Sequence, residues 1–502
     1  MSNVQPIVRL LMPARRVKAR ARPVPAATGC AKKMIVTPML LMIAALMNAA
    51  VTSAAWAGDD LLTAWQGAER HDPVFGAARE RLQAGRARQQ QGAALLRPQL
   101  ALTGSAAVVS SDNDTTGAQF SAPGFGRSTA AEFRTRVNAG QSAGWALVAQ
   151  QPLYNAERFA SARQLDRQGL LAEAQFGAAR QDLILRTAHA YFAVLLAQDA
   201  LDTLQAQREA AARARDVAGG KFDEGASPVT DRDEARARFD EIGARELTAR
   251  NELEMKRMEF SDLSGLQADH LDRVKPDAAF VQLAAGSLAE WSARAARENP
   301  LVQMQELGHA VARDEIDKFR ALTSPSVDLI ARIADDRLQG GNGAGSTTVT
   351  SSVRSIGVQL TIPLYEGGMR SAKRDEAEAL ARKAGLDVAA LRQEVVRQTR
   401  AAWLGVSTGI AQIHAHEQAL QSARSRLGAT ETGNEVGART MLDLMNAQSD
   451  FFQARRNLAQ ARYQLLLNRL RLAATAGSLA ETELREVNAY LSRGATLTAP
   501  TR

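Results

Sequence analysis

Apolar and polar positions along the chain follow two different periods, and the periods alternate in blocks. Residues 59–96 and 287–322 have apolar positions three or four apart, which is the period of an amphipathic helix. Both blocks end just before a proline, Pro98 and Pro325. Because proline cannot continue an α-helix, we expect one helix in each block.

Two segments with a period of two follow each of these blocks. The alternating positions run from Leu100 to Val108, Val137 to Leu147, Val327 to Ile333, and Ile356 to Ile362. This period predicts β-strands, with polar, glycine-containing connections at Ser110 to Thr135 and at Asp335 to Ser352. Such runs fit the strands of a membrane β-barrel and those of a half-buried soluble sheet, and the pattern alone does not choose between them.

Most of the remaining chain is predicted to form very long helices. Residues 156–218 and 367–432 contain no proline and are rich in Ala, Leu, Arg, Gln and Glu. Each would form a rod of roughly 95 Å, which is longer than a compact domain and requires coiled-coil packing. Each rod should then reverse at a short turn into a second helix. The expected turns and second helices are Gly219 to Pro228 with 229–264, and Gly433 to Arg439 with 440–476.

The two halves of the chain share short motifs in the same order. RHDPV at 70–74 corresponds to RENPL at 297–301, QPLY at 151–154 to IPLY at 362–365, and FDEG at 222–225 to NEVG at 434–437. Matching motifs at nearly constant spacing indicate a tandem duplication.

Residues 1–57 have the three parts of a secretory signal peptide. The segment contains eight basic residues and no acid, an uncharged apolar run of fourteen residues from Met34 to Met47, and a small-x-small pattern at Ala55 to Ala57. The apolar run is shorter than the ~20 residues that span a bilayer, so cleavage after Ala57 is favoured over a membrane anchor. We therefore divide the chain into a signal peptide with its basic leader at 1–57, structural repeats at 58–285 and 286–490, and a short C-terminal tail at 491–502.

The net charge of the chain without its leader differs from that of the full chain. The full chain has 62 basic and 54 acidic residues, a formal charge of +8. The leader holds the whole excess, so the mature chain is neutral and no nucleic-acid partner is expected. The only cysteine, Cys30, also lies in the leader. His414 and His416 are two residues apart on a predicted helix, so their side chains face different directions and do not form a metal-binding pair. We expect the chain to bind no metal and no cofactor and to have no enzyme activity.

Four strands cannot close a membrane barrel, because the smallest barrels have about eight strands, and open sheet edges are excluded from the hydrocarbon region. If the strands cross a membrane, several copies of the chain must share one barrel. The long rods would then form a ring of helices below it.

Several segments resemble the TolC family of outer-membrane channel-tunnels. They are GARTMLDLMNAQ at 437–448, LAQARYQLLLN at 458–468, and the PLY motifs at 152–154 and 363–365. The resemblance implies a mainly α membrane protein with an internal tandem duplication. It also implies a homotrimer in which coiled-coil helices form an α-helical barrel. Four strands per chain would contribute to a shared twelve-stranded β-barrel in the outer-membrane lipid. It also implies docking onto an inner-membrane transporter, with the ABC type favoured, and onto a periplasmic adaptor protein.

The same resemblance assigns residues of a gated periplasmic entrance to the helical turns. The matching positions are Thr230, Asp231, Arg439 and Asp443. Asn434 and Asn446 depart from the best-known members, which have tyrosine and a second aspartate at these places. The contacts that close the entrance are therefore expected to be weaker or to involve different partners, and the entrance to be less acidic. Three copies of Asp443 would form a ring that attracts cations. The alternative is structural, because acids and hydroxyls in a first helical turn also serve as caps.

On the strands, we expect Trp145, Leu147, Val358 and Leu360 to face lipid. The leading functional hypothesis is an outer-membrane duct of a type I secretion system, which passes a polypeptide handed over by the transporter. One alternative is the outer-membrane component of a multidrug or metal efflux pump. Another is a soluble periplasmic coiled-coil adaptor.

Overall fold

The computed structural model describes residues 60–124, 126–276, 278–283, 286–320, 324–341 and 345–492. The chain divides into two units, 1–57 and 58–502, and only the second contains described residues. The predicted signal peptide therefore lies outside the described residues.

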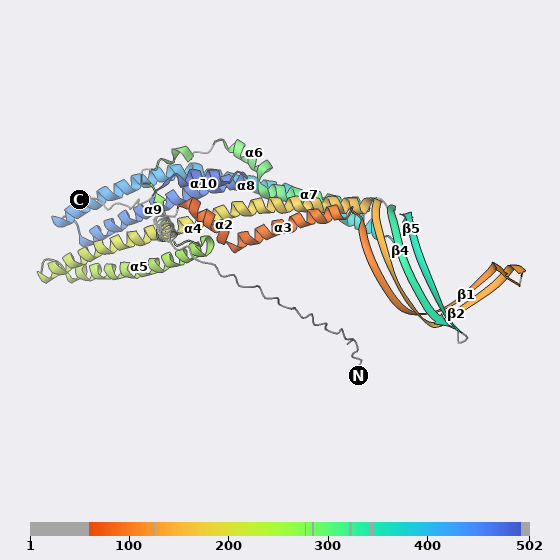
Figure 1. Ribbon diagram of the computed structural model, residues 1–502. Helices are drawn as coiled ribbons and strands as arrows, with labels where there is room; N and C mark the ends of the chain where they lie inside the picture. Colours follow the sequence, from red (N-terminus) through yellow and green to blue (C-terminus); the bar gives the residue numbers. More distant parts are fainter. Residues whose placement is uncertain are drawn as a thin grey trace, which may run out of the picture. The chain divides into compact units, whose positions relative to one another are not determined.

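One order of elements occurs twice in the second unit: two helices, two strands and two long helices (Figure 1). The first set is α2 (Leu61–His71), α3 (Pro73–Ala94), β1 (Gln99–Ala122), β2 (Gly126–Asn155), α4 (Ala156–Asp223) and α5 (Val229–Ser264). The second set is α6 (Leu288–Glu298), α7 (Pro300–Phe319), β4 (Ser326–Gly341), β5 (Ser346–Thr361), α8 (Met369–Glu435) and α9 (Met441–Thr475). The other described elements are β3 (Arg273–Val274), η1 (Phe280–Leu283), α10 (Glu481–Asn488) and β6 (Leu491–Ser492). The repeated order shows the internal duplication.

The helices expected at 59–96 and 287–322 are each broken in two, so the prediction of one continuous helix is wrong in both places. The Asp72 side chain accepts hydrogen bonds from the backbone N–H groups of Val74 and Phe75, and Pro73 occupies the first position of α3. At the start of α7, the Asn299 side chain accepts hydrogen bonds from the backbone N–H groups of Leu301 and Val302, and Pro300 occupies the first helical position. A capping side chain followed by proline starts a new helix, and this local preference outweighs the continuing apolar period.

The two rods are present and slightly longer than expected. α4 has 68 residues and α8 has 67, which corresponds to about 100 Å each. Each rod runs through the glycines at its far end and stops only where Gly225 (φ 71°) and Gly437 (φ 77°) adopt a left-handed backbone that a helix cannot contain. The rods then return as α5 and α9, which pack against them along their lengths.

The main core is concentrated where α2, α4, α5 and α9 meet. Its largest fully buried side chains include Trp65, Tyr191, Phe192, Phe260 and Leu465. Each such residue stabilises the fold by about 1.5–3 kcal/mol through burial of apolar surface. Near the helical turns α4, α5 and α9 meet in a smaller buried cluster of alanines and methionines. This second cluster consists of Ala214, Ala218, Ala235, Met441 and Met445.

The four long strands form one antiparallel sheet in the order β1-β2-β4-β5. Side chains of directly paired residues lie on the same side of a sheet, so the register defines two faces. The apolar face contains Leu100, Leu102, Trp145, Leu147, Leu329, Ile333, Ile356, Val358 and Leu360, and also the charged residues Asp335 and Arg354. The polar face contains Thr103, Ser105, Gly144, Arg332, Asp336, Ser355 and Gln359.

The strands are longer than the segments in which apolar and polar residues alternate. Most of the segments expected as connections, Ser110 to Thr135 and Asp335 to Ser352, belong to strands, and that prediction is wrong. The β1–β2 hairpin continues beyond the end of β4 and β5, and cross-strand ion pairs Asp112–Arg136 (2.6 Å) and Asp114–Arg134 (2.6 Å) join its two strands. In the described part of the chain, no helix has both the length and the apolar character needed to cross a membrane.

Candidate functional site

The turn between α8 and α9 is closed by backbone hydrogen bonds to one carbonyl. The N–H groups of Ala438 and Arg439 donate to the Gly433 oxygen at 2.8 and 3.0 Å. The Asn434 side-chain amide donates to the Arg439 carbonyl at 3.1 Å, so two of the predicted entrance residues are joined within one chain. The Arg439 side chain lies over Gly433, where a Cβ would come within 2.8 Å of its Cγ.

Asp443 and Thr440 form a complete capping box at the start of α9. The Asp443 N–H donates to the Thr440 hydroxyl oxygen at 3.1 Å, and the Thr440 N–H donates to the Asp443 carboxylate at 3.1 Å. These hydrogen bonds, helped by the charge of Arg439, hold the pKa of Asp443 below its usual value. The carboxylate is therefore ionised at neutral and mildly acidic pH, as both a cap and a charged ring require.

The turn between α4 and α5 is built differently. Pro228 precedes α5 without a side-chain cap, and Thr230 and Asp231 lie in the first helical turn. The guanidinium of Arg232 lies 4.4 Å from the centroid of the Phe222 ring, which ties the start of α5 to the end of α4.

The structure does not join all of the predicted entrance residues. In the described part of this single chain, no side-chain hydrogen bond or ion pair links Thr230 or Asp231 to the residues of the other turn. Asn446 is exposed on α9, one helical turn beyond Asp443. A capping role is thus visible for Asp443, whereas the gating roles of the six residues remain proposals.

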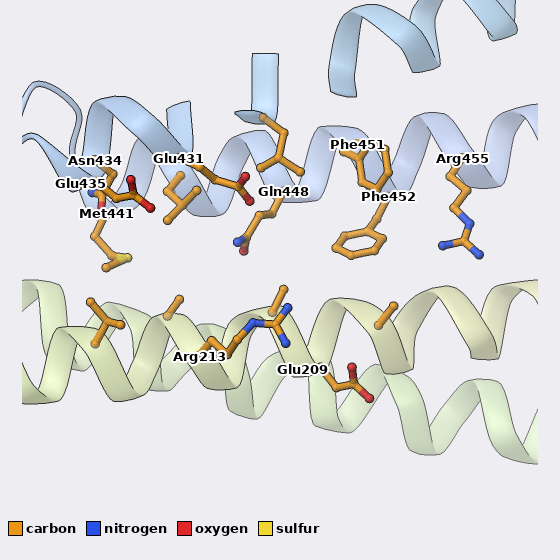
Figure 2. A pocket seen from close by; sticks show the side chains of 16 residues that line it. Glu209, Arg213, Glu431, Asn434, Glu435, Met441, Gln448, Phe451, Phe452 and Arg455 are labelled. Carbon is orange, nitrogen blue, oxygen red and sulfur yellow. The ribbon is translucent and has the colours of Figure 1, made fainter. Parts of the chain in front are cut away.

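A groove of about 510 Å³ separates the α4–α5 hairpin from the α8–α9 hairpin close to the turns (Figure 2). Arg213 and Glu209 line it from α4, and Glu431, Gln448 and Phe452 line it from α8 and α9. Its aromatic rings, its methionine and its arginines are residue types that are enriched at protein interfaces.

The four predicted lipid-facing residues all lie on the apolar face of the sheet. Trp145, Val358 and Leu360 are 43%, 64% and 60% exposed in the single chain, and Leu147 is half-buried. The period of two therefore identified one continuous surface formed by all four strands. A lipid environment for this face remains a proposal at this point.

A buried charged cluster, which the sequence pattern did not reveal, lies beside the short β3–β6 ladder. The Tyr463 hydroxyl donates to the Asp199 carboxylate at 2.7 Å, and Arg273 contacts Asp199 at 3.3 Å and Asp202 at 3.0 Å. Burial raises the pKa of Asp199 despite these partners. The cluster fixes β3 against α4 and α9.

In the described residues, no group of three or more His, Cys, Asp or Glu side chains is placed to hold a metal ion. His414 lies 3.6 Å from Glu417 on the exposed surface of α8, as a surface pair would.

Comparisons with known proteins agree with this architecture. Residues 65–265 and 291–478 match the family described as outer membrane efflux protein. The chain is 32% identical to the outer membrane protein TolC of Vibrio cholerae over 349 residues, which are 68% of this chain and 78% of that protein. It is 31% identical to the alkaline protease secretion protein AprF of Pseudomonas aeruginosa, over 70% of this chain and 73% of AprF. The proteases secretion protein PrtF of Dickeya chrysanthemi is 26% identical over 68% of this chain and 74% of its own length.

Solved structures show the same fold at low sequence identity. The outer membrane protein VceC of Vibrio cholerae has a TM-score of 0.65 and 18% identity, covering 83% of this chain and 96% of VceC. The channel CusC has a TM-score of 0.67 and 18% identity, covering 84% of this chain and 93% of CusC. The fold predicted from the sequence, a mainly helical channel-tunnel with a duplicated chain, is confirmed.

Proposed function

The chain belongs to the outer membrane efflux protein family and is an outer-membrane channel that extends into the periplasm, and on this premise we propose that it is the exit duct of a type I secretion system. Its cargo is a polypeptide, which an inner-membrane ABC transporter and a periplasmic adaptor deliver. The family membership removes the alternative of a soluble periplasmic adaptor.

One observation carries the choice of a polypeptide cargo. Two of the relatives, AprF and PrtF, are named as protease secretion proteins, and the chain matches about three quarters of the length of each. The similarity therefore extends over most of the duct and is not confined to one motif.

The unpaired edges of the sheet require several copies of the chain, and the resemblance to TolC suggests that the copies number three. β1 and β5 each pair on one side only, so one chain leaves two open edges that a bilayer would not tolerate. Three copies pair β1 of one chain with β5 of the next and close a twelve-stranded barrel. The apolar face then contacts lipid, through Trp145, Leu147, Val358 and Leu360, and the polar face lines the lumen.

The groove between the two helical hairpins supports the proposed adaptor. It lies near the turns, which would be the periplasmic end, and its charged and aromatic lining suits a helical hairpin. Cleavage after Ala57 would deliver a neutral chain with repeats at 58–285 and 286–490.

The second candidate function is multidrug or metal efflux, which the family name itself favours. A deletion strain separates the two functions. We expect the growth medium of the deletion strain to lack specific large polypeptides and the full-length chain to restore them. The lowest inhibitory concentrations of drugs and divalent metals should change less than twofold. An unchanged set of secreted polypeptides with several-fold higher drug or metal sensitivity would favour efflux instead.

A further inference from the structure

A second hollow lies where the helices meet the sheet, far along the rods from the turns. Its volume is about 610 Å³, and it is formed by the end of β2, the start of α4, the end of α7 and the start of α8. Its lining combines aromatic rings with four cations and one carboxylate. These residues are Tyr154, Phe159, Arg163, Asp317, Lys318, Arg320 and Arg370.

The register places this hollow at the edge of the apolar face. Tyr154 pairs with Val327, and Val327 pairs with Leu360, so the Tyr154 side chain lies on the same face as the proposed lipid-facing residues. The Tyr154 and Phe159 rings are 6.4 Å apart and carry the aromatic surface from the sheet into α4. Tyrosine at the border between an apolar band and charged residues is typical of a membrane interface.

The charges of the hollow are only partly balanced. Arg163 forms an ion pair with Asp317 at 2.8 Å, and Lys318 forms one with Glu315 at 2.8 Å. Arg370 donates to the Lys318 carbonyl at 2.6 Å, at the end of α7. Arg320 has no hydrogen-bond or ion-pair partner in the described part of the chain, although it follows α7 directly and lines the hollow. Arg163 also lies 3.8 Å from Asp314, so the four cations of the lining face three acids of α7, Asp314, Glu315 and Asp317, and one positive charge remains in excess.

Two helices also begin at this hollow. α4 starts at Ala156 and α8 at Met369, and Gly368 provides no side-chain cap for α8. The partial positive charge at a helix start adds to the field of the arginines. A purely structural role, in which the cations only hold the ends of α4, α7 and α8 together, accounts for Arg163, Lys318 and Arg370, whereas Arg320 is exposed and takes no part in these contacts.

We propose that this hollow binds the phosphate headgroup of an anionic phospholipid in the periplasmic leaflet of the outer membrane. Arg320 contacts the phosphate, for which the planar, two-pronged guanidinium is well suited. The acyl chains follow the apolar face along the strands, from Tyr154 toward Leu329 and Leu147. A lipid fits better than free phosphate because the hollow borders an apolar surface that only a lipid would cover. The inference goes beyond the choice of cargo and requires only that the sheet lies in the membrane.

The test measures lipid binding to the purified, delipidated full-length assembly by native mass spectrometry. We expect phosphatidylglycerol to bind about tenfold more tightly than phosphatidylcholine, and inorganic phosphate at equal concentration not to displace it. Arg320→Gln should weaken phosphatidylglycerol binding about tenfold and leave phosphatidylcholine binding unchanged, whereas Arg320→Lys should recover part of the loss. A matched control is Arg382→Gln, which removes the same charge from an exposed position on α8.

Equal affinities of the wild-type assembly for the two lipids would overturn the proposal without any variant, so a folding defect of Arg320→Gln does not prevent a decision. Displacement by inorganic phosphate would also overturn it, because the site would then recognise a free anion. Equal losses in the Arg320 and Arg382 variants would show a general charge effect and would contradict the assignment. These outcomes do not depend on the cargo, so failure of the secretion proposal can be distinguished from failure of this one.

Discussion

Replacing Gly477 by alanine is expected to remove the folded channel from the outer membrane. Gly477 ends α9 with φ 77°, a backbone that costs an L-residue about 1–2 kcal/mol. A Cβ at this position would also lie 2.2 Å from the carbonyl oxygen of Glu298, at the end of α6. The obstacle is backbone and cannot rotate away, so the overlap adds about 1–3 kcal/mol.

The surroundings of Gly477 make relaxation costly. The Ser478 N–H donates to the Ala473 carbonyl at 2.9 Å and closes the end of α9. Asn299, the residue that caps α7, also donates from its side chain to the Thr475 carbonyl at 2.8 Å. Moving the Gly477 backbone would therefore disturb the end of α9 and the start of α7 together.

Gly437→Ala is the matched control. Gly437 has the same φ of 77°, but no atom lies within 4 Å of a Cβ built there. The Gly437→Ala variant should lose only the stability of about 1–2 kcal/mol that the left-handed backbone costs an L-residue, and it should still assemble. The measurement is the amount of heat-modifiable oligomer in outer-membrane fractions. Equal amounts of oligomer in the two variants would show that the close approach to Glu298 is unimportant.

Asp443→Asn is expected to lower the preference of the channel for cations about two- to fivefold, because a ring of three charges is removed at once. Asparagine keeps an oxygen that can accept from the Thr440 N–H, so α9 should still begin at the same place. The measurement is the reversal potential across planar bilayers under a salt gradient. The hydrogen bonds from Thr440 lower the pKa of Asp443 and the like charges of the ring oppose this effect, so wild-type selectivity should be lost as the pH falls through the ordinary range for aspartate.

Thr440→Ala separates the charge from the cap. It removes the hydroxyl that accepts from the Asp443 N–H but leaves the carboxylate in place. We expect it to reduce the stability of the turn by about 1 kcal/mol and to keep most of the selectivity. Similar selectivity losses in the two variants would mean that Asp443 acts through the turn and not as a charged ring.

The long elements could be predicted because their periods extend over many residues. α5 has the bounds that its pattern indicates, 229–264, and the apolar positions of four separate segments converge on one face of the sheet. Asp72-Pro73 and Asn299-Pro300 each start a new helix, a local signal that the longer apolar period conceals.

Other features depend on contacts that no local pattern contains. The β1–β2 extension consists largely of small and polar residues, which have no apolar period to count. The Tyr463–Asp199 hydrogen bond joins residues 264 positions apart, and only the folded chain brings them together. The excess of cations around Arg320 likewise combines residues from α4, α7 and α8.

Photocrosslinking inside the barrel during export tests the central claim most directly. Gln359 and Val358 are adjacent on β5 and lie on opposite faces of the sheet, with Gln359 on the polar face. A photoreactive amino acid in place of Gln359 should crosslink to the polypeptide in transit, whereas the same group in place of Val358 should crosslink only to lipid. Continued secretion with no polypeptide crosslinked at Gln359, or with polypeptide crosslinked only at Val358, would contradict a polypeptide duct lined by the polar face.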